Sequence, residues 1–350
     1  MYKVAIIGAG IGAEHLKGYQ ANADRFEVTA ICDLDAARGQ ALATLGKTAH
    51  TTDFDDVLQS DADIIDVCLP PHLHLPFAIK ALEVGKHVVV EKPMVASLAE
   101  ADALAQSSKE ANREVFPVFQ YRFGTGTTQL RALQDAGLTG KPFVATLETH
   151  WNRPAAYYDV DWRGTWATER GGAMLGHAIH IHDLLTGILG PVAEVHAMTD
   201  TRVNTIEVED CAALSIAMAN GCLVTSSVTL GAADDTSRLR LIYEGMTVES
   251  DHAPYQPAAA PWTFTARAPF NQGNIDEITT QIEPQPIGFN GMFKAVADAL
   301  DGKPSAAVRL EDGRRSLEFV TAVYHSARTG QPVKLPIAKD HPLYDNWMPS

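Results

Sequence analysis

A glycine-rich turn between an apolar strand and a helix is the feature that most constrains the fold of this chain. Residues 2–7 form a short run rich in β-branched residues, and glycines interrupt it before helical spacing resumes at Glu14. Without side chains, the backbone turns sharply and approaches a pyrophosphate, to which the following helix offers unpaired N–H groups. The Gly-x-Gly-x-x-Ala pattern therefore predicts a dinucleotide site. Its turn residues are Gly8, Gly10, Ile11 and Gly12.

Asp33 strengthens this prediction because it ends the second apolar run about twenty residues beyond the turn. A carboxylate at that place accepts hydrogen bonds from the adenosine ribose hydroxyls and repels a 2'-phosphate, which favours NAD over NADP. Leu34 follows it in the predicted contact region. Arg38 either reaches toward the cofactor or lies on a solvated helix face. The competing interpretation is a plain glycine turn with a helix-capping aspartate.

Strands and helices alternate over the first third of the chain. Strands separated by helices need right-handed crossovers, which predicts a parallel Rossmann sheet covered by helices on both faces. We expect this dinucleotide-binding domain to span residues 1–122, ending with an irregular or edge strand that contains a proline. The strand-like runs after the first are 28–33, 62–69, 87–93 and 115–123, and the helix-like runs are 36–45, 74–85 and 98–113.

Longer alternating runs with few helices between them follow in residues 123–350, the predicted substrate-binding and oligomerisation domain. This pattern favours an α+β domain built on a large, mostly antiparallel open sheet. Residues 253–273 combine proline, alanine and aromatic residues without periodicity and predict a long loop. Helical spacing returns from about residue 289, and these helices are expected to pack back near the first domain. The strand-like runs are 143–152, 193–203, 210–231 and 238–251.

Composition limits the possible partners of the chain. A formal net charge of -15 repels nucleic-acid phosphates and anionic lipid surfaces, so neither partner is expected. No apolar run has the length of a membrane span, and the first residues do not read as a secretory signal. The cysteines lie in apolar stretches without CxxC spacing, which indicates reduced core thiols. A cytoplasmic protein that binds a small molecule is therefore expected.

Polar segments follow two neighbouring strands of the predicted sheet, at the edge where ligands bind. Leu69, Pro70 and His74 follow one strand, and Glu91 and Lys92 follow the next. Here the sequence resembles the glucose-fructose oxidoreductase / inositol dehydrogenase family, also called Gfo/Idh/MocA. The resemblance spans most of the chain and rests on the glycine pattern, PP-x-x-H, ALEVGKHVVVEKP and GGAMLGHAIHIHDLL.

The resemblance implies a Rossmann domain that binds NAD, a second domain whose open sheet often mediates homo-dimers or homo-tetramers, and redox chemistry at a sugar or polyol carbinol. Lys92 matches the family's lysine of the Glu-Lys-Pro motif, which lies beside the nicotinamide and the substrate hydroxyl. An ammonium group suits this place because it donates to the reacting oxygen, and partial burial lowers a lysine pKa toward a useful range.

The second catalytic segment is rich in histidine. Helical spacing after two glycines predicts that His177, His180 and Asp183 share one helix face. By resemblance, His180 is the general base or acid, and an imidazole titrates near neutrality. Four residues earlier the family frequently has an aspartate, but Gly176 stands here. Two hypotheses stay open: His177 compensates or binds substrate, and Asp183 orients His180. The resemblance implies no metal, and the spacing is not a strong zinc signature.

Other polar and aromatic residues match or neighbour the family's site. Their alternative interpretation is hydrogen bonding within loops or at a domain interface. Gln120, Trp162 and Arg163 match places near the nicotinamide end of the cofactor. The predicted substrate-binding residues are Lys92, Tyr121, Arg122, Asn152, Arg163, His177 and His180, with Arg153 and Asp161 nearby in sequence.

Three hypotheses for the function follow. The leading one is an NAD(H)-dependent dehydrogenase that interconverts a secondary alcohol and a ketone of a sugar, an inositol-like cyclic polyol or a sugar derivative. The second is a redox-neutral glycosidase that oxidises a sugar carbon transiently and expels the aglycone by elimination. The third is a dinucleotide-binding regulator or structural subunit without turnover, which Lys92 and His180 disfavour. The sequence leaves the sugar, the carbon and the direction open.

Overall fold

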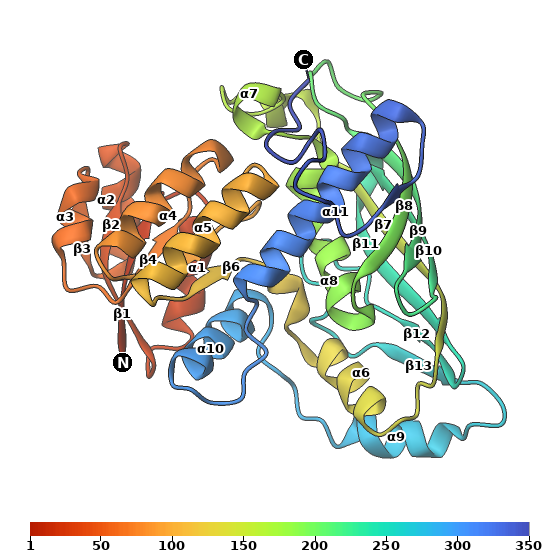
Figure 1. Cartoon of the computed structure of the whole chain (residues 1–350). Helices are drawn as coiled ribbons and strands as arrows, with labels where there is room; N and C mark the ends of the chain where they lie inside the picture. The colour runs from red at the N-terminus through yellow and green to blue at the C-terminus, as the bar shows by residue number, and fades with distance from the viewer. Residues whose placement is uncertain (350) are drawn as a thin grey trace. The chain divides into compact units, whose positions relative to one another are not determined.

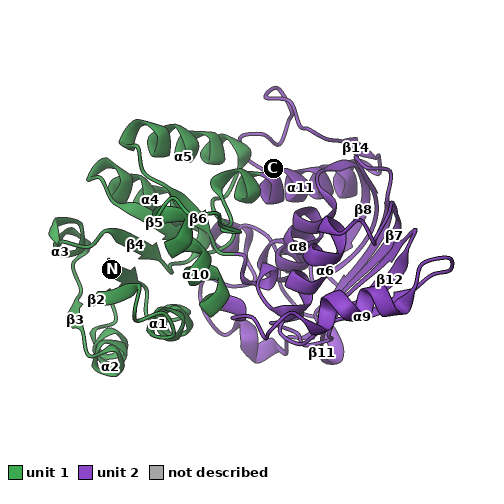
Figure 2. Ribbon diagram, turned by 90° about the horizontal axis from the view of Figure 1, so that it is seen from below, with its two compact units in different colours: residues 1–118, 289–314 green, residues 119–288, 315–350 purple. Residues whose placement is uncertain are grey.

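A computed structural model describes residues 1–349 of the chain (Figure 1), which divide into two compact units (Figure 2). Unit 1 contains residues 1–118 and 289–314. Unit 2 contains residues 119–288 and the chain from 315 onward. Each unit has its own sheet, which confirms the predicted fold class. Within residues 1–349 no helix has the length and hydrophobicity of a bilayer span.

Unit 1 is built on a six-stranded sheet in the order β3-β2-β1-β4-β5-β6, with every neighbouring pair parallel. The central strands are mostly apolar because helices cover both faces, with α4 and α5 on one side and α1 and α2 on the other (Figure 2). The strands are β1 Tyr2–Ile7, β2 Phe26–Cys32, β3 Ala49–Thr51, β4 Ile64–Val67, β5 His87–Val90 and β6 Val115–Pro117. The helices are α1 Gly12–Gln20, α2 Ala36–Gly46, α3 Phe54–Gln59, α4 His74–Glu83 and α5 Leu98–Ala111.

A helix from far along the chain completes unit 1. The aromatic ring of Phe293, on α10 (Gly288–Leu300), stacks on Tyr19 of α1 with ring centroids 3.8 Å apart. Gly18 permits this approach, since a Cβ there would lie 2.7 Å from the Phe293 ring. Asn22 adds hydrogen bonds to the backbone and side chain of Asn290. The core of unit 1 therefore draws on two stretches separated by about half of the chain.

Unit 2 contains an eight-stranded sheet in the order β13-β12-β11-β7-β10-β9-β8-β14. Its neighbouring strands are antiparallel except β7 and β10, which run parallel. Helices α6, α8 and α11 lie along one face of this sheet (Figure 1). The strands are β7 Pro142–Asn152, β8 Val192–Asp200, β9 Cys211–Met218, β10 Leu223–Thr229, β11 Gly231–Tyr243, β12 Met246–Glu249, β13 Thr263–Ala266 and β14 Val333–Lys334. The helices are α6 Thr125–Asp135, α7 Trp166–Glu169, α8 Ile179–Leu189, α9 Gln272–Thr280 and α11 Leu310–Thr329.

Two local predictions were wrong. The segment 253–273 is not wholly a loop, because β13 extends the sheet edge through it and pairs with β12. The run 115–123 is a strand only as far as Pro117, and a 3-10 helix takes over at Gln120–Arg122. In both places short apolar stretches were assigned from their own pattern, whereas pairing with a neighbouring strand decides where a short strand begins and ends.

Candidate active site

The glycine turn of unit 1 leaves room for a phosphate only at its middle position. Gly8 has φ +99°, and a Cβ there would lie 2.3 Å from the carbonyl oxygen of Cys68. A Cβ on Gly12 would lie 2.9 Å from the Ile6 side chain. Gly10 differs, because no atom lies within 4 Å of its Cβ position. Gly8 and Gly12 therefore permit the packing of the turn, whereas Gly10 borders open space, where the sequence predicts the pyrophosphate.

Asp33 lies directly after β2 with only 5% of its surface exposed. Its oxygens accept hydrogen bonds from the backbone N–H groups of Ala9, at 2.6 Å, and Asp35, at 2.8 Å. Arg38 adds guanidinium bonds of 2.9 and 3.1 Å. Burial works against ionisation, but the bond from Arg38 and those from the two backbone groups outweigh it and lower the pKa of Asp33. Leu34, by contrast, is 90% exposed.

The backbone around Lys92, which is half-buried, is held from both sides. The Lys92 N–H donates to Glu91 Oε2 at 2.9 Å, and Glu91 Oε1 lies 3.1 Å from His15 Nε2. On the other side, His74 Nδ1 lies 2.7 Å from the carbonyl oxygen of Pro93, and its second nitrogen lies 2.7 Å from another backbone carbonyl. Two buried histidines thus fix the segment that carries the lysine.

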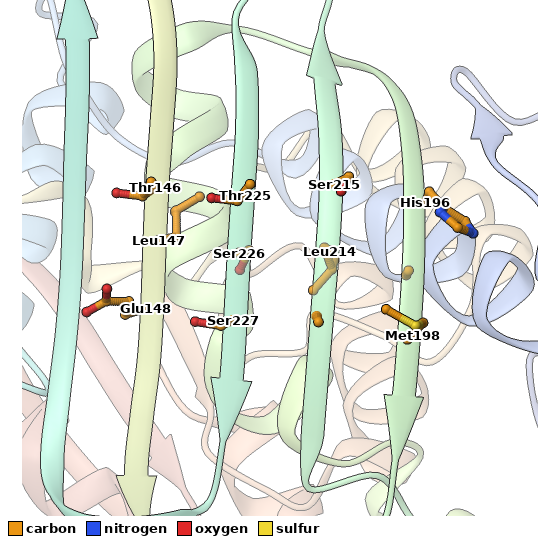
Figure 3. Close-up of a pocket in the computed structure, with 12 residues that line it drawn as sticks. Thr146, Leu147, Glu148, His196, Met198, Leu214, Ser215, Thr225, Ser226 and Ser227 are labelled. Atoms are coloured by element: carbon orange, nitrogen blue, oxygen red, sulfur yellow. The ribbon is translucent and has the colours of Figure 1, made fainter.

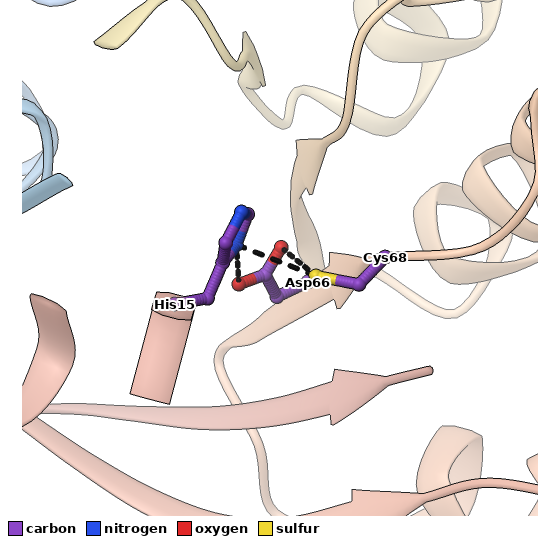
Figure 4. Close-up of side chains that lie close together, drawn as sticks. All are labelled: His15, Asp66 and Cys68. Carbon is purple, nitrogen blue, oxygen red and sulfur yellow. Dashed lines mark hydrogen bonds and ion pairs between the residues drawn. The ribbon is translucent and has the colours of Figure 1, made fainter. Parts of the chain in front are cut away.

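His15 belongs to a buried polar cluster with Asp66 and Cys68 (Figure 4). Its Nδ1 lies 2.8 Å from Asp66 Oδ2 and 3.3 Å from Cys68 Sγ, while Nε2 faces Glu91. Burial alone lowers a histidine pKa, but the Asp66 charge and the hydrogen bonds outweigh it and raise the pKa of His15 well above its ordinary value. The side-chain atoms of His15, Asp66 and Cys68 that could bind a metal ion lie within 4.8 Å of one another. Direct hydrogen bonds between the side chains already join them.

In unit 2 the histidine-rich segment begins as a π-helical turn over 174–178 and continues as α8. Glu209 caps its start. This buried carboxyl accepts from the backbone N–H groups of Gly172, at 3.1 Å, and Met174, at 3.0 Å, and from the Tyr324 hydroxyl at 3.1 Å. Burial raises the pKa of Glu209 to about 7, against the hydrogen bonds that lower it.

His177 and His180 of this segment contact aromatic residues of unit 2. The His180 ring is 5% exposed and stacks on Tyr121 with centroids 4.8 Å apart. The Tyr121 hydroxyl donates to the carbonyl oxygen of Pro254, so this residue supports the histidine ring with its own hydroxyl already engaged. His177 Nε2 lies 3.3 Å from the Tyr157 hydroxyl. Both imidazoles are therefore held in place by neighbouring rings.

Asp183 forms a bidentate ion pair with Arg122, with two bonds of 2.6 Å. Ser316 adds a third contact to the same carboxylate at 3.3 Å. Both Asp183 oxygens are thus occupied by a guanidinium, and the two charges compensate each other. The hypothesis that Asp183 orients His180 gains no support from these contacts.

Arg153 is a buried guanidinium surrounded by aromatic rings. It lies 4.7 Å from the centroid of Trp151 and 5.2 Å from that of Tyr157, both within cation–π range. Asp235 balances its charge at 3.0 Å. This residue therefore helps to shape the unit 2 surface without adding net charge.

Arg163 differs from Arg153 in having no salt bridge to any residue in the described range 1–349. Its guanidinium lies 3.8 Å from the Tyr157 ring centroid and 4.3 Å from that of Trp162. Burial, together with the neighbouring Arg153 charge, lowers its pKa. The charge of the Glu169 carboxylate opposes this lowering, so Arg163 has a carboxylate in its neighbourhood although the two form no salt bridge in residues 1–349.

Family models match both units of the chain. The model described as "Oxidoreductase family, NAD-binding Rossmann fold" matches residues 2–119, and the GFO/IDH/MocA C-terminal domain model matches residues 127–249. This chain belongs to the GFO/IDH/MocA oxidoreductase family. NAD is therefore its cofactor, as the glycine turn and Asp33 predicted.

Relatives with names include two sugar-related dehydrogenases. The chain is 26% identical to D-glucoside 3-dehydrogenase of Escherichia coli (strain K12), over 95% of this chain and 97% of that protein. It is 27% identical to inositol 2-dehydrogenase of Salmonella typhimurium (strain LT2) over 45% and 51% of the two chains. Among solved structures, the WlbA dehydrogenase from Chromobacterium violaceum, in complex with NADH and UDP-GlcNAcA, is 28% identical with a TM-score of 0.85 and 96% coverage of both chains.

The residues present in this GFO/IDH/MocA protein fit NAD. The Gly10 face of the turn is open, and the buried Asp33 carboxylate lies beside it. In unit 2, Gln120 Oε1 is buried without a hydrogen-bond partner among residues 1–349, as an acceptor awaiting a ligand donor would be.

The predicted site residues fall into two groups, one in each unit, and their individual contacts with cofactor and substrate stay predictions. His74 has both ring nitrogens on backbone carbonyls, so its side chain ties loops together. Unit 1 carries Gly8, Gly10, Ile11, Gly12, Asp33, Leu34, Arg38, Leu69, Pro70, His74, Glu91 and Lys92. Unit 2 carries Gln120, Tyr121, Arg122, Asn152, Trp162, Arg163, His177 and His180.

Sequence reasoning missed the buried groups that support these residues. His15 lies on α1 and Asp66 on β4, and nothing local in the sequence marks His15 as the partner of Asp66 and Glu91. A weak signal existed for His15, which follows the glycine turn by three residues on the apolar side of a helix, where a polar residue needs a partner.

Proposed function

We propose that this NAD-dependent oxidoreductase oxidises a secondary alcohol of a sugar, a glycoside or another sugar derivative to a ketone, and catalyses the reverse reduction. The observation that carries the proposal is the placement of Lys92. Its ammonium stem is half-buried, at the carboxyl edge of the parallel sheet, on backbone fixed by Glu91 and by His74. Ligands of open parallel sheets bind at that edge, next to the phosphate-binding turn.

Each protein group has a role in this reaction. Lys92 donates a hydrogen bond to the reacting oxygen and stabilises negative charge that develops there. His180 accepts the carbinol proton, since an imidazole changes its protonation near neutral pH. When bound, NAD supplies the hydride-accepting nicotinamide. Aromatic residues around Arg153 offer apolar faces for a sugar ring, and Arg163 offers a cation for an anionic substituent.

The relatives support a sugar-like substrate. D-glucoside 3-dehydrogenase, which matches nearly the full chain, is named for a glucoside, and the WlbA structure is a complex with UDP-GlcNAcA. The half-buried guanidinium of Arg163, which lies against two aromatic rings, supports a substrate with a carboxylate or phosphate.

The test is a substrate panel followed by two separate signals. Purified protein is incubated with NAD and free sugars, inositols, alkyl and aryl glycosides, uronic acids and nucleotide sugars, while NADH and released aglycone are measured. NADH formation supports the proposal. Aglycone without net NADH supports the redox-neutral glycosidase, and neither signal across the panel would leave only a non-catalytic role.

Lys92→Met tests the assignment of the lysine. Removing a group that stabilises the transition state lowers kcat by about 10²- to 10⁴-fold. NAD affinity, measured by fluorescence titration, should stay within about threefold of the wild type because the glycine turn and Asp33 are untouched. A variant that keeps full turnover would remove Lys92 from the mechanism.

We also propose that the protein forms a homo-dimer or homo-tetramer through the eight-stranded sheet. A shallow pocket of about 370 Å³ lies over β7, β8, β9 and β10, lined largely by small and hydroxyl side chains (Figure 3). Exposed apolar side chains lie on the same strands, such as Met198 at 67% and Leu223 at 61%. Light scattering of the wild type and of Met198→Glu tests this face.

The free cysteines fit a cytoplasmic setting, which cell fractionation checks.

A further inference from the structure

A buried carboxylate occupies the space that the missing side chain leaves at Gly176. Glu169, the last residue of α7, is 6% exposed. A Cβ placed on Gly176 would have one atom within 4 Å, Glu169 Oε1, at 3.8 Å. The glycine in the histidine segment therefore faces a carboxylate from another element, seven residues earlier in the chain.

The carboxylate of Glu169 is fixed in this orientation. Its Oε2 accepts a hydrogen bond of 2.5 Å from the backbone N–H of Gly164. Gly164 has φ +75°, a conformation that favours glycine, so the turn that presents this N–H is specific. One oxygen is therefore held by the loop that carries Arg163, and the other points to the histidine segment.

The position beside Gly176 lies on the same helix face as His180. The two residues are four apart, and residues at this spacing lie one above the other on a helix. Gly176 lies in the π-helical turn over 174–178, and His180 lies in the first turn of α8, which continues it. A buried anion at this place favours the protonated form of a nearby imidazole and stabilises one ring orientation.

We propose that Glu169 is a positioning carboxylate for His180, supplied from α7 in place of a side chain at residue 176. The inference rests on the proposed function in one respect, that His180 moves the carbinol proton. Glu169 raises the proton affinity of the imidazole through its charge and holds the ring for proton transfer, without itself contacting the reacting atoms.

Several other ionisable groups surround the histidine segment, so the test must separate Glu169 from them. Glu209 is the important one, because the pKa of its carboxyl lies at about 7 and it caps the same turn. Other such groups among residues 1–349 are Tyr121, which stacks on His180, Tyr157, Tyr158, Arg163, His177, His182, Tyr324 and the Arg122–Asp183 ion pair.

Relocating the carboxylate gives the sharpest experiment. Glu169→Gln keeps the shape and the Gly164 contact but removes the charge. It should lower kcat by about 10- to 100-fold and move the acidic limb of the kcat–pH profile down by about one unit, with KM nearly unchanged. In Glu169→Ala, adding Gly176→Asp should recover at least about tenfold of kcat, whereas adding Gly176→Asn should not.

Two controls separate positioning from folding. Glu207→Gln changes an exposed glutamate that caps the N-terminus of α7 through the Trp166 N–H, and it should leave the pH profile in place. Glu209→Gln shows which part of the profile belongs to the other carboxyl. Equal loss in the Asp and Asn relocation variants, with a matching drop in Tm, would reduce Glu169 to a structural residue and overturn the proposal.

A measurement without turnover keeps this inference distinct from the proposed function. The imidazole signals of His180, assigned by comparison with His180→Gln, are titrated by NMR. Glu169→Gln should lower the His180 pKa by about half a unit or more, and the relocated aspartate should restore it. If the relocated aspartate restores the His180 pKa but the protein is active on no sugar, the proposed function fails and the role of Glu169 stands. If Glu169→Gln is active and its His180 pKa is unchanged, the role of Glu169 fails and the proposed function stands.

Discussion

Each unit of this protein buries a histidine almost completely, yet the two imidazoles are in opposite states. In unit 1, His15 lies between the carboxylates of Asp66 and Glu91, and its pKa is raised well above the ordinary value. In unit 2, His182 has Ser226 as its hydrogen-bond partner at 2.9 Å, and burial lowers its pKa to about 3.

This difference shows that neighbours, more than burial, set the charge of a buried histidine. In unit 1 the charged His15 holds Glu91, which in turn accepts a hydrogen bond from the backbone of Lys92. Unit 2 holds the helix α8 through the Arg122–Asp183 ion pair, the Glu209 cap and aromatic rings, and the ring of His182 on this helix is neutral. We therefore expect the loss of the charge at His15 to destabilise the fold more than the loss of the neutral ring at His182.

Removal of the buried charge in unit 1 should have the largest effect. His15→Gln leaves two buried carboxylates facing each other, which should lower the free energy of unfolding by about 3–5 kcal/mol. Chemical denaturation measures it. Adding Asp66→Asn removes one of the opposing charges and should return part of the loss. A cost below about 1 kcal/mol for the single variant would mean that His15 is neutral and the contrast with His182 does not hold.

The two histidines should also respond to pH with opposite signs. The pKa of His182 is lower in the folded protein than in the unfolded chain, so its contribution to stability is present above pH 6.5 and is lost as pH falls toward 3. Between pH 6.5 and pH 4, protonation of this residue should therefore lower the free energy of unfolding by about 3 kcal/mol. His182→Gln should abolish that part of the acid sensitivity. The raised pKa of His15 gives stability that is present below pH 6.5 and lost as pH rises beyond it. Parallel pH curves for the wild type and His182→Gln would contradict the neutral state.

Two glycine variants test the prediction for the glycine turn of unit 1. Gly10→Ala adds a methyl into open space, so Tm should change little, while NAD binding weakens about tenfold, or about 1.4 kcal/mol, because the methyl meets the phosphate. Gly8→Ala should instead unfold the turn, since its Cβ would overlap the Cys68 carbonyl. Calorimetry and NAD titration distinguish the two, and unchanged NAD affinity in Gly10→Ala would move the pyrophosphate elsewhere.

The smallest effect is expected at the aromatic surface of unit 2. Arg163→Leu removes a guanidinium that stacks on two rings, which should raise KM for an anionic sugar about fivefold, or about 1 kcal/mol. Arg163→Lys keeps the charge and should recover part of the loss. KM for a neutral glycoside should hardly change. Equal effects on both substrates would show that Arg163 acts through packing alone.

The sequence predicts the fold and the cofactor turn because their signals are local. Gly8, Gly10 and Asp33 lie within one strand-turn-helix-strand unit, and the alternation of apolar runs is enough to order the parallel sheet. The supporting groups escape prediction because their contacts are distant in sequence: His15 meets Glu91 across 76 positions and Asp66 across 51. Short elements such as β13 also depend on a paired strand rather than on their own pattern.

The completion of unit 1 by α10 has a consequence for synthesis of the chain. During translation the first 118 residues, with all six strands of the sheet, leave the ribosome long before Phe293 is synthesised. Until then Tyr19 and Phe26, both buried in the finished protein, lack the ring that covers them. The nascent dinucleotide unit therefore presents an aromatic patch during about half of its translation, a natural binding surface for a chaperone.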